Sequence, residues 1–239
     1  MQRILYSLAC ADRVRHYSPH VWKIILALKH KGLDFELKPV SFKEISQIED
    51  GSFKSIPVLN DNGHLEGDSF GIAVYLEERY RDGDSLFGGE GGLATARFVE
   101  AFSQAVIHPP VSTIAVMDMH AMMSPEDQAY FRAAREKRFG KSLEAFHANK
   151  DVELAGLAAR LAPMRIVLEK QPWMGGQRPL FADYILFGAL QWARICTPTK
   201  LLADDDPIKE WFERCLDLHG GIGRSAAASV EHDIQHTML

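Results

Sequence analysis

The segment KSIPVLNDNGHLEGDSFGIAVYLEERY, residues 54–80, contains the signals that decide the fold. An apolar run over residues 56–59 is followed by Asn-Asp-Asn-Gly, residues that accept the positive φ angles of a hairpin turn, and Leu65 continues the second strand. Apolar residues then recur at helical spacing behind Asp68 and Ser69, which predicts a helix that begins at this polar pair. The segment therefore predicts strand, tight turn, antiparallel strand and helix.

Two features of this segment point to ligand binding. Pro57 lies in the first strand, where a proline removes a hydrogen-bond donor and so belongs at an edge, a strand start or a bulge. A cis peptide after Ile56 would turn backbone groups of the strand toward a ligand, and a trans proline at a strand start is the alternative. The free N–H groups of the helix start at Asp68 and Ser69 form an anion site.

The residues before this segment predict a β-α-β unit. An apolar strand over 4–8 is followed by a polar loop and by Ser18-Pro19, a strong helix start in which serine caps the free N–H groups and proline takes the first helical position. This helix ends at Gly32, and a second strand over 35–40 returns parallel to the first through a right-handed crossover. With a short helix between 41 and 52, the order is β-α-β-α-β-β-α.

The chain after residue 81 predicts a different kind of domain. Residues 82–92 are rich in glycine and have no periodicity, which is typical of a linker. Beyond them the apolar spacing is helical throughout, so we expect an α/β domain over 1–81 and an all-α domain over 93–239. The expected helices cover 98–106, ending at Pro109-Pro110, and then 114–123, 126–148, 154–169, 183–196 and 207–218.

Composition narrows the class of function. The 239 residues are 46% hydrophobic and 25% charged with a net charge of −5, which provides no basic field for a nucleic acid. No apolar run approaches the ~18 residues of a membrane span. Three widely spaced cysteines, Cys10, Cys196 and Cys215, form no disulfide framework. We therefore expect a soluble protein of a reducing, cytoplasmic compartment, without a polyanionic partner.

This organisation resembles the cytosolic glutathione transferases, in which a thioredoxin-like α/β domain precedes an all-helical domain. Ser-Ile-Pro-Val at 55–58 is similar to the family's cis-proline strand, and Asp68-Ser69 is similar to its acid-serine pair. The resemblance implies that glutathione is the co-substrate and that the chain forms a homodimer. It also implies that the backbone of Ile56, beside Pro57, pairs with the cysteinyl part of glutathione, while Asp68 and Ser69 hold the γ-glutamyl end.

Two further stretches extend the resemblance. SPHVWKIILALKHKG at 18–32 is similar to the first helix of the bacterial β-etherase-like and fungal etherase-related branch. This implies a hydrophobic, aromatic electrophile, with β-aryl ether cleavage as the narrower hypothesis. FADY at 181–184 resembles the signature of the helical domain, but Leu180 replaces the usual capping residue. Asp183 is therefore expected to be structural in some other way.

Ser18 is the candidate catalytic residue. A thiol with a pKa near 8.5 is only about 3% ionised at pH 7, and lowering that pKa by about two units needs roughly 2.7 kcal/mol of preference for the anion. One hydrogen bond to a charged acceptor supplies about 1.5–3 kcal/mol, and a helix N-terminus about 0.3–1 more. Ser18 with its own helix start therefore suffices. A plain N-cap is the structural alternative, Tyr17 is a second candidate hydroxyl, and the lack of cysteine here argues against reductase chemistry.

Other residues have weaker assignments. Lys54 or Lys43 is expected to bind the glycine carboxylate of glutathione, although either could simply be a solvated lysine. Aromatic and methionine side chains could line an apolar cleft for the electrophile or belong to the core; the candidates are Tyr17, Trp22, Met117 and Met119. His232 and His236 have the spacing of metal ligands, but no third ligand accompanies them, so no metal site is expected.

Two rival functions remain open. A glutathione-binding or hydrophobe-binding protein without turnover would need Pro57, Asp68 and Ser69 but not the Ser18 hydroxyl. A glutathione-dependent isomerase would use the same thiolate, which would add to the substrate and leave again.

Overall fold

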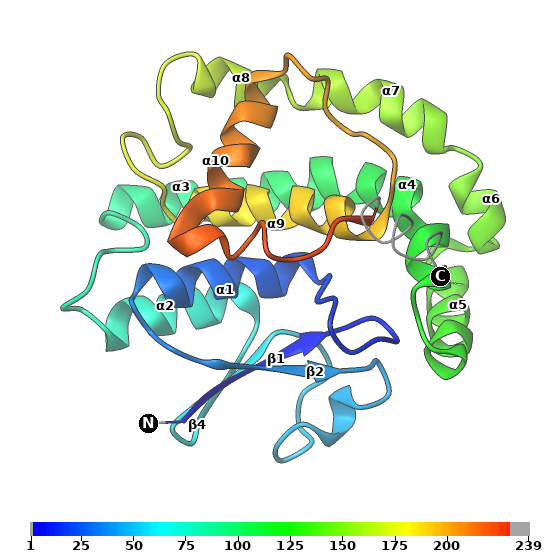
Figure 1. Cartoon of the computed structure of the whole chain (residues 1–239), viewed down its shortest axis with the longest axis horizontal. Helices are drawn as coiled ribbons and strands as arrows, with labels where there is room; N and C mark the ends of the chain where they lie inside the picture. Colours follow the sequence, from blue (N-terminus) through cyan, green and yellow to red (C-terminus); the bar gives the residue numbers. More distant parts are fainter. Residues whose placement is uncertain (1, 230–239) are drawn as a thin grey trace.

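The N-terminal domain is built on a mixed sheet. The computed structural model describes residues 2–229. Strands β1 (Arg3–Leu8), β2 (Glu36–Val40), β3 (Val58–Asp61) and β4 (His64–Gly67) form one sheet in the order β2-β1-β3-β4 (Figure 1). β1 pairs parallel with β2, and the β1–β3 and β3–β4 pairs are antiparallel. The predicted crossover and hairpin are confirmed.

The turn between β3 and β4 has the conformation that its sequence favours. Asn62 and Gly63 have φ angles of 55° and 94°, and the Gly63 N–H group donates to Asn60 Oδ1 at 2.8 Å. Positive φ at two successive positions suits asparagine and glycine, because larger side chains meet the backbone there. The register follows from this turn, with Asn60 opposite Leu65.

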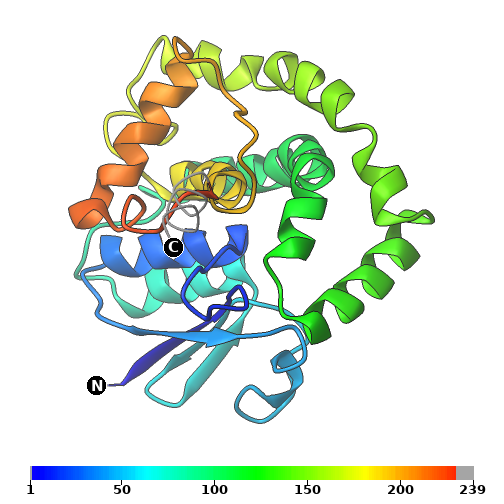
Figure 2. The same ribbon diagram turned by 45° about the vertical axis from the view of Figure 1, so that its right-hand side comes forward.

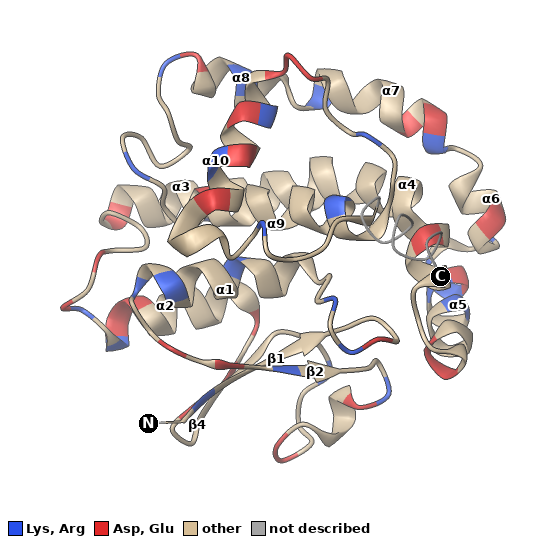
Figure 3. Cartoon of the chain, in the orientation of Figure 1, with Lys and Arg blue, Asp and Glu red and all other residues tan. Residues whose placement is uncertain are grey.

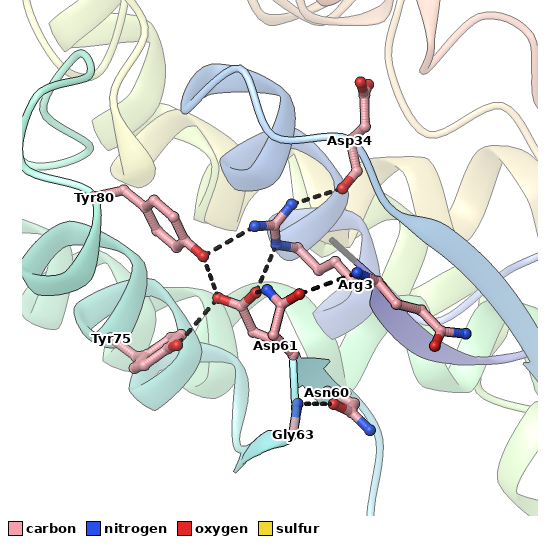
Figure 4. A network of polar contacts seen from close by, with 9 residues as sticks. Arg3, Asp34, Asn60, Asp61, Gly63, Tyr75 and Tyr80 are labelled. Carbon is pink, nitrogen blue, oxygen red and sulfur yellow. Dashed lines mark hydrogen bonds and ion pairs between the residues drawn. The ribbon is translucent and has the colours of Figure 1, made fainter.

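A polar network fastens this hairpin to β1 and to the second helix (Figure 4). Arg3 and Asp61 form a buried ion pair, with Arg3 Nε 3.1 Å from Asp61 Oδ1. Tyr75 donates to the same carboxylate at 3.0 Å, and Tyr80 also donates to it. Arg3 also donates to the Asp34 carbonyl at 2.7 Å. Because every partner is satisfied, the buried charges cost little and the domain's edge is held in one arrangement.

Two helices cover one face of the sheet in Figures 1 and 2: α1 (Pro19–His30) and α2 (Ser69–Arg79). α1 begins at Pro19, as predicted, because proline lacks the N–H group that a first-turn position leaves unbonded. It buries Val21, Ile24 and Ile25 against the sheet and the helical domain. A short 3-10 helix, η1 (Ile45–Gln47), occupies the expected place between β2 and β3.

The helical domain differs from the predicted helices in where its breaks fall. Pro109 and Pro110 lie at the start of a helix rather than at an end, because the preceding segment continues through a π-helical turn into it. The expected helix 126–148 is broken at Gly140, which has a φ of 68°. The elements are α3 (Glu90–Phe102), η2 (Ser103–Ile107), α4 (His108–Ala121), α5 (Pro125–Phe139), α6 (Leu143–His147), α7 (Lys150–Arg160), α8 (Ala162–Leu168), α9 (Phe181–Cys196) and α10 (Pro207–Gly221).

α9 is the central helix of the molecule and packs along α1 (Figures 1 and 2). Gly188 lies so close to α1 that a Cβ atom there would be 2.3 Å from the Pro19 carbonyl oxygen. Tyr184 is fully buried, and its hydroxyl lies 2.6 Å from His30 Nδ1. The N-terminal domain and the helical domain are therefore joined directly at the helix that begins with Ser18-Pro19.

Few charged residues lie on this central helix. Figure 3 shows charges of both signs interspersed over the outer elements, whereas α9 is almost free of them. No helix within residues 2–229 is long and apolar enough to cross a membrane.

Candidate active site

A cavity of about 650 Å³ lies between the two domains. Its walls come from the start of α1, the loop before β3 and helices α4, α5 and α9, and Figure 2 shows α4 and α5 beside the loops of the N-terminal domain. Within the lining, the Phe42 ring packs against those of Tyr130 and Phe131, with ring centroids 5.8 and 5.9 Å away. Residues far apart in the chain thus meet around one space.

Ser18 lies at the wall of this cavity. It occupies the N-cap position of α1 and is 5% exposed. The predicted side-chain cap is wrong, because the Ser18 hydroxyl makes no hydrogen bond within residues 2–229 and only its carbonyl joins the helix, accepting from the Trp22 N–H group at 3.2 Å. The hydroxyl is therefore free to donate into the cavity at a positive helix end.

The proline strand borders the same space. The Ile56–Pro57 peptide bond is cis, so the alternative of a trans proline is excluded. Lys54, Ser55 and Ile56 line the cavity, whereas Pro57 is buried behind them. Neither the N–H nor the C=O group of Ile56 forms a hydrogen bond within the described chain. An extended peptide in the cavity could pair with both.

Asp68 and Ser69 form the corner where α2 begins, outside the lining of the cavity. Asp68 has a φ of 63°, is exposed, and accepts a hydrogen bond from the Gly71 N–H group at 2.9 Å. Ser69 is 4% exposed, and its hydroxyl accepts from Lys23 Nζ at 3.3 Å. The pair thus combines an exposed carboxylate with first-turn N–H groups, as predicted for a helix start.

Lys23 connects this corner to the cavity. Its side chain is fully buried, and Nζ donates to both oxygens of Glu100, at 2.7 and 2.8 Å. The same nitrogen lies 3.1 Å from Nδ1 of His20, which lines the cavity. Burial lowers the pKa of Lys23, and the Glu100 carboxylate opposes that shift. Lys23 is not among the residues predicted from the sequence, although a charge between Trp22 and Ile24 on an apolar face is a visible signal.

His108 lies beside His20, with ring centroids 5.3 Å apart, and lines the cavity from the start of α4. Burial and the charge of Lys23 lower the pKa of His108 to about 3, and burial also lowers that of His20. Both rings are therefore neutral near pH 7. Nε2 of His108 is buried and has no hydrogen-bond partner within residues 2–229. Neither histidine is among the residues predicted from the sequence.

Comparison with known families identifies this architecture. Residues 94–218 match the model of the glutathione S-transferase C-terminal domain, and residues 14–84 match the model of the N-terminal domain. This chain belongs to the glutathione S-transferase family. The expected thioredoxin-like fold with a helical second domain is confirmed, and glutathione is the co-substrate of this family.

Individual relatives of this transferase are distant. Glutathione transferase GSTFuA3 from Phanerochaete chrysosporium has a similar structure, with a TM-score of 0.74 and 27% identity, and the match covers 92% of each chain. CsGST83044 of Ceriporiopsis subvermispora, solved in complex with glutathione, has a TM-score of 0.71 at 23% identity and covers 95% of this chain and 96% of that one. The glutathione S-transferase-like protein ustS of Aspergillus flavus is 22% identical over 209 residues, 75% of each protein.

The remaining predicted residues divide between the transferase's cavity and its core. Tyr17 and Met119 line the cavity; burial raises the pKa of Tyr17, so its hydroxyl stays protonated. Trp22 and Met117 are absent from the lining, and the Trp22 ring donates to the His16 carbonyl at 2.8 Å. The structure therefore brings together about half of the proposed hydrophobic site.

The two lysines proposed for the glycine carboxylate are placed differently. Lys54 lines the cavity, is exposed and has no ion pair within residues 2–229. Lys43 lies 3.3 Å from the Glu126 carboxylate, outside the lining. His232 and His236 lie outside the described residues, within which no group of three or more potential metal ligands occurs.

Proposed function

We propose that this chain conjugates glutathione to a hydrophobic, aromatic electrophile and that Ser18 stabilises the attacking thiolate. The observation that carries this proposal is the free Ser18 hydroxyl, which lies at the cavity wall and at the start of α1. A hydroxyl without a partner within residues 2–229 can donate to sulfur without giving up an existing bond. The positive end of the helix favours the same anion.

The surrounding groups fit the three parts of glutathione. The free N–H and C=O groups of Ile56 pair with the cysteinyl residue in the manner of a short antiparallel strand. Lys54 neutralises the glycine carboxylate. At the other end, Asp68 binds the α-ammonium group, while Ser69 and the first-turn N–H groups of α2 bind the α-carboxylate. The buried charge of Lys23, 3.3 Å from the Ser69 hydroxyl, supports the anion at this end.

The electrophile occupies the part of the cavity lined by aromatic and apolar side chains. The thiolate sulfur forms a bond to the electrophilic carbon, and the leaving group departs with the bonding electron pair. Cleavage of a β-aryl ether is the narrower proposal: the aryl oxide is then the leaving group and takes a proton from solvent. The likeness of the first helix to the etherase-related branch supports this narrower substrate class.

Replacement of Ser18 tests the proposal. In Ser18→Ala we expect the pKa of bound glutathione to rise by about one to two units, since about 1.5–3 kcal/mol of anion stabilisation is lost. The rate with an aryl chloride at pH 6.5 should fall about tenfold or more. The measurements are ultraviolet titration of the bound thiolate and turnover across a pH series.

Ser112→Ala is the matched control, because Ser112 lines the same cavity from α4, and it should leave the thiol pKa unchanged. Binding of glutathione without turnover in wild type, unaffected by Ser18→Ala, would indicate a binding protein instead. Failure of wild type to bind glutathione would contradict the whole assignment.

Assembly and location complete the proposal. We propose a homodimer, as is general in the family, and an exposed Phe98 on α3, 72% exposed, offers an apolar contact for it. A solution mass of twice 26.8 kDa is the corresponding measurement. Three buried free thiols fit a reducing, cytoplasmic compartment, which localisation of the tagged protein tests.

A further inference from the structure

The charged residues of the cavity wall all have the same sign. Lys54, Arg135 and Arg138 line the cavity, and within residues 2–229 no aspartate or glutamate does. This is unexpected in a chain whose net charge is −5. A wall of cations in an acidic protein creates a local positive potential that attracts anions to this cavity rather than to the surface at large.

The two arginines lie on one face of α5, three residues apart. Arg135 is half-buried, and its guanidinium carbon lies 5.1 Å from the centroid of the Phe131 ring. Neither arginine forms an ion pair or a hydrogen bond within the described chain. Burial and the like charge of Arg138 lower the pKa of Arg135. A half-buried guanidinium without a paired carboxylate is unfavourable, and an anion bound beside it would stabilise its charge.

Arg132, on the same helix, differs from these two arginines because it is paired with carboxylates. It lies 3.0 Å from the Glu136 carboxylate and 2.9 Å from that of Glu144, outside the cavity lining. The helix therefore has carboxylates within reach of an arginine, and they pair with the arginine that does not line the cavity. On α5, the two arginines that line the cavity are therefore unpaired within residues 2–229, and the arginine outside the lining is paired.

Flat aromatic rings adjoin the two arginines. The rings of Phe139 and Phe146 are stacked, with centroids 3.8 Å apart and planes 7° apart, and both residues line the cavity. Tyr130 and Phe131 line it from the same helix as Arg135. Such a wall accepts a planar ring by stacking, and guanidinium groups at its edge bind a carboxylate or sulfonate in a forked arrangement.

We propose that Arg135 and Arg138 bind the anionic group of an aromatic acid, so that the electrophile of this enzyme is an aryl compound bearing a carboxylate or sulfonate. The inference rests on the proposed function for the conjugation step itself. The carboxylates of glutathione have other partners in that scheme, Lys54 and the Asp68-Ser69 corner, which leaves the arginines of α5 for the second substrate. Arg135, the more buried of the two, contributes more.

Binding of two fluorescent ligands tests the anion site without any catalytic step. 8-Anilinonaphthalene-1-sulfonate and N-phenyl-1-naphthylamine share the same aromatic skeleton and differ in the sulfonate. We expect Arg135→Gln to weaken binding of the sulfonate about tenfold, which corresponds to about 1.4 kcal/mol, and to change binding of the neutral amine less than twofold. Arg138→Gln should act in the same direction with a smaller loss, and Arg135→Lys should restore part of the affinity.

Lys137→Gln is the matched control, since it removes one positive charge from the same helix at an exposed residue outside the cavity lining. It should leave both affinities unchanged. Equal losses for both ligands in Arg135→Gln would overturn the proposal, because Arg135 would then act only by packing. A loss for the sulfonate of the same size in Lys137→Gln would also overturn it, because the effect would then be one of overall charge.

Kinetics separate this inference from the proposed function. In conjugation of 4-chloro-3-nitrobenzoate, the glutathione sulfur bonds to the ring carbon and chloride leaves with the electron pair. Arg135→Gln should raise the KM for the benzoate about tenfold relative to any change in the KM for 4-chloro-3-nitrobenzamide. The rates with the two compounds are each divided by the uncatalysed rate before they are compared. An increase in KM for glutathione alone would overturn the inference and assign Arg135 to the peptide. If wild type conjugates neither compound, the proposed function fails, and the ligand pair still decides the anion site.

Discussion

Burial and the charge of Lys23 together keep the histidines around it neutral. Its ammonium group is fully buried and neutralised by Glu100, and it lies 3.1 Å from Nδ1 of His20. Burial lowers the pKa of His108, and the positive charge of Lys23 lowers it further. The cavity therefore presents neutral imidazoles to a bound substrate. Nε2 of His108 is buried and has no partner within residues 2–229, and whether it carries the ring proton depends on the tautomer.

The stability of the chain should depend on pH through His108. Its pKa is about 3 in the folded chain and near 6.5 when unperturbed, so between these values the unfolded chain binds a proton that the folded chain does not. Stability is therefore lost as the pH falls through this window. Between pH 7 and pH 5 the free energy of unfolding of wild type should fall by about 2 kcal/mol more than that of His108→Gln. Urea unfolding at the two pH values measures the difference.

Ser112→Ala is the control for this experiment, because Ser112 lines the same cavity from α4 and does not titrate. It should show the same pH dependence as wild type. A His108→Gln variant that loses stability in parallel with wild type would contradict the assignment of a neutral, buried imidazole.

The residues of the site could be predicted from sequence only where a local pattern marks them. Ser18 follows from a helix start and Pro57 from a proline in the apolar run that leads into β3, since both are local rules. The sequence pattern places Ser18 at the N-cap position, but it does not specify whether the hydroxyl bonds to the helix or stays free. His20, His108 and Arg135 come together around the cavity through packing between domains, and their spacing in the chain, from the first helix to the fifth, carries no such signal.

Among the elements, the start of α9 depends on a residue other than its cap. Leu180 has no side-chain acceptor, and Asp183, fully buried, replaces it. The carboxylate accepts hydrogen bonds from the N–H groups of Met174, Gly175 and Leu180 at 2.7–2.9 Å and from the Trp211 ring at 2.9 Å. It thus holds the loop before α9 and the helix α10 together. The structural role expected for Asp183 is found, in a form that joins three segments.

Removal of this carboxylate should be strongly destabilising. Asp183→Ala leaves four N–H groups without their acceptor, two of them buried and two half-buried. Each such loss costs about 1–3 kcal/mol before water or relaxation compensates, so we expect a net loss of about 4 kcal/mol and a fall in Tm of about 10 °C. Thermal unfolding followed by circular dichroism measures it. Asp151→Ala, at an exposed position of α7, should change stability by less than about 0.5 kcal/mol; a similar Tm for both variants would refute the role of Asp183.

Element boundaries were predictable where capping residues and tertiary packing agree. The start of α1 and the β3–β4 turn fall where the sequence places them. The expected helix over 126–148 ends early because Gly140 adopts a left-handed conformation, which its sequence permits but does not require. The expected stop at Pro109 becomes a start, since a π-helical turn carries the preceding helix through. Apolar periodicity continues across such breaks and so does not reveal them.

At the scale of the whole molecule, the contact between α1 and α9 joins the helix that begins after Ser18 to the helical domain (Figure 1). Ser18 begins α1, and the next residue, Pro19, meets α9 through its carbonyl oxygen. At the far end of α1, His30 lies beside the buried Tyr184 hydroxyl. The position of the Ser18 hydroxyl is therefore set by packing between domains, and a change confined to α9 should reach it.

Gly188→Ala is the substitution that tests this coupling. The added methyl group would lie 2.3 Å from the Pro19 carbonyl oxygen, a backbone atom that can move away only if the start of α1 moves with it. We expect overpacking to cost about 1–3 kcal/mol in urea unfolding. Because the displacement falls beside Ser18, kcat/KM for a neutral aryl chloride should also fall, by about tenfold or more. Gly91→Ala is the control: a Cβ there meets nothing within 4 Å, so the variant should keep full activity and gain up to about 1 kcal/mol. A Gly188→Ala enzyme with the stability and activity of wild type would show that the domains do not position Ser18 through this contact.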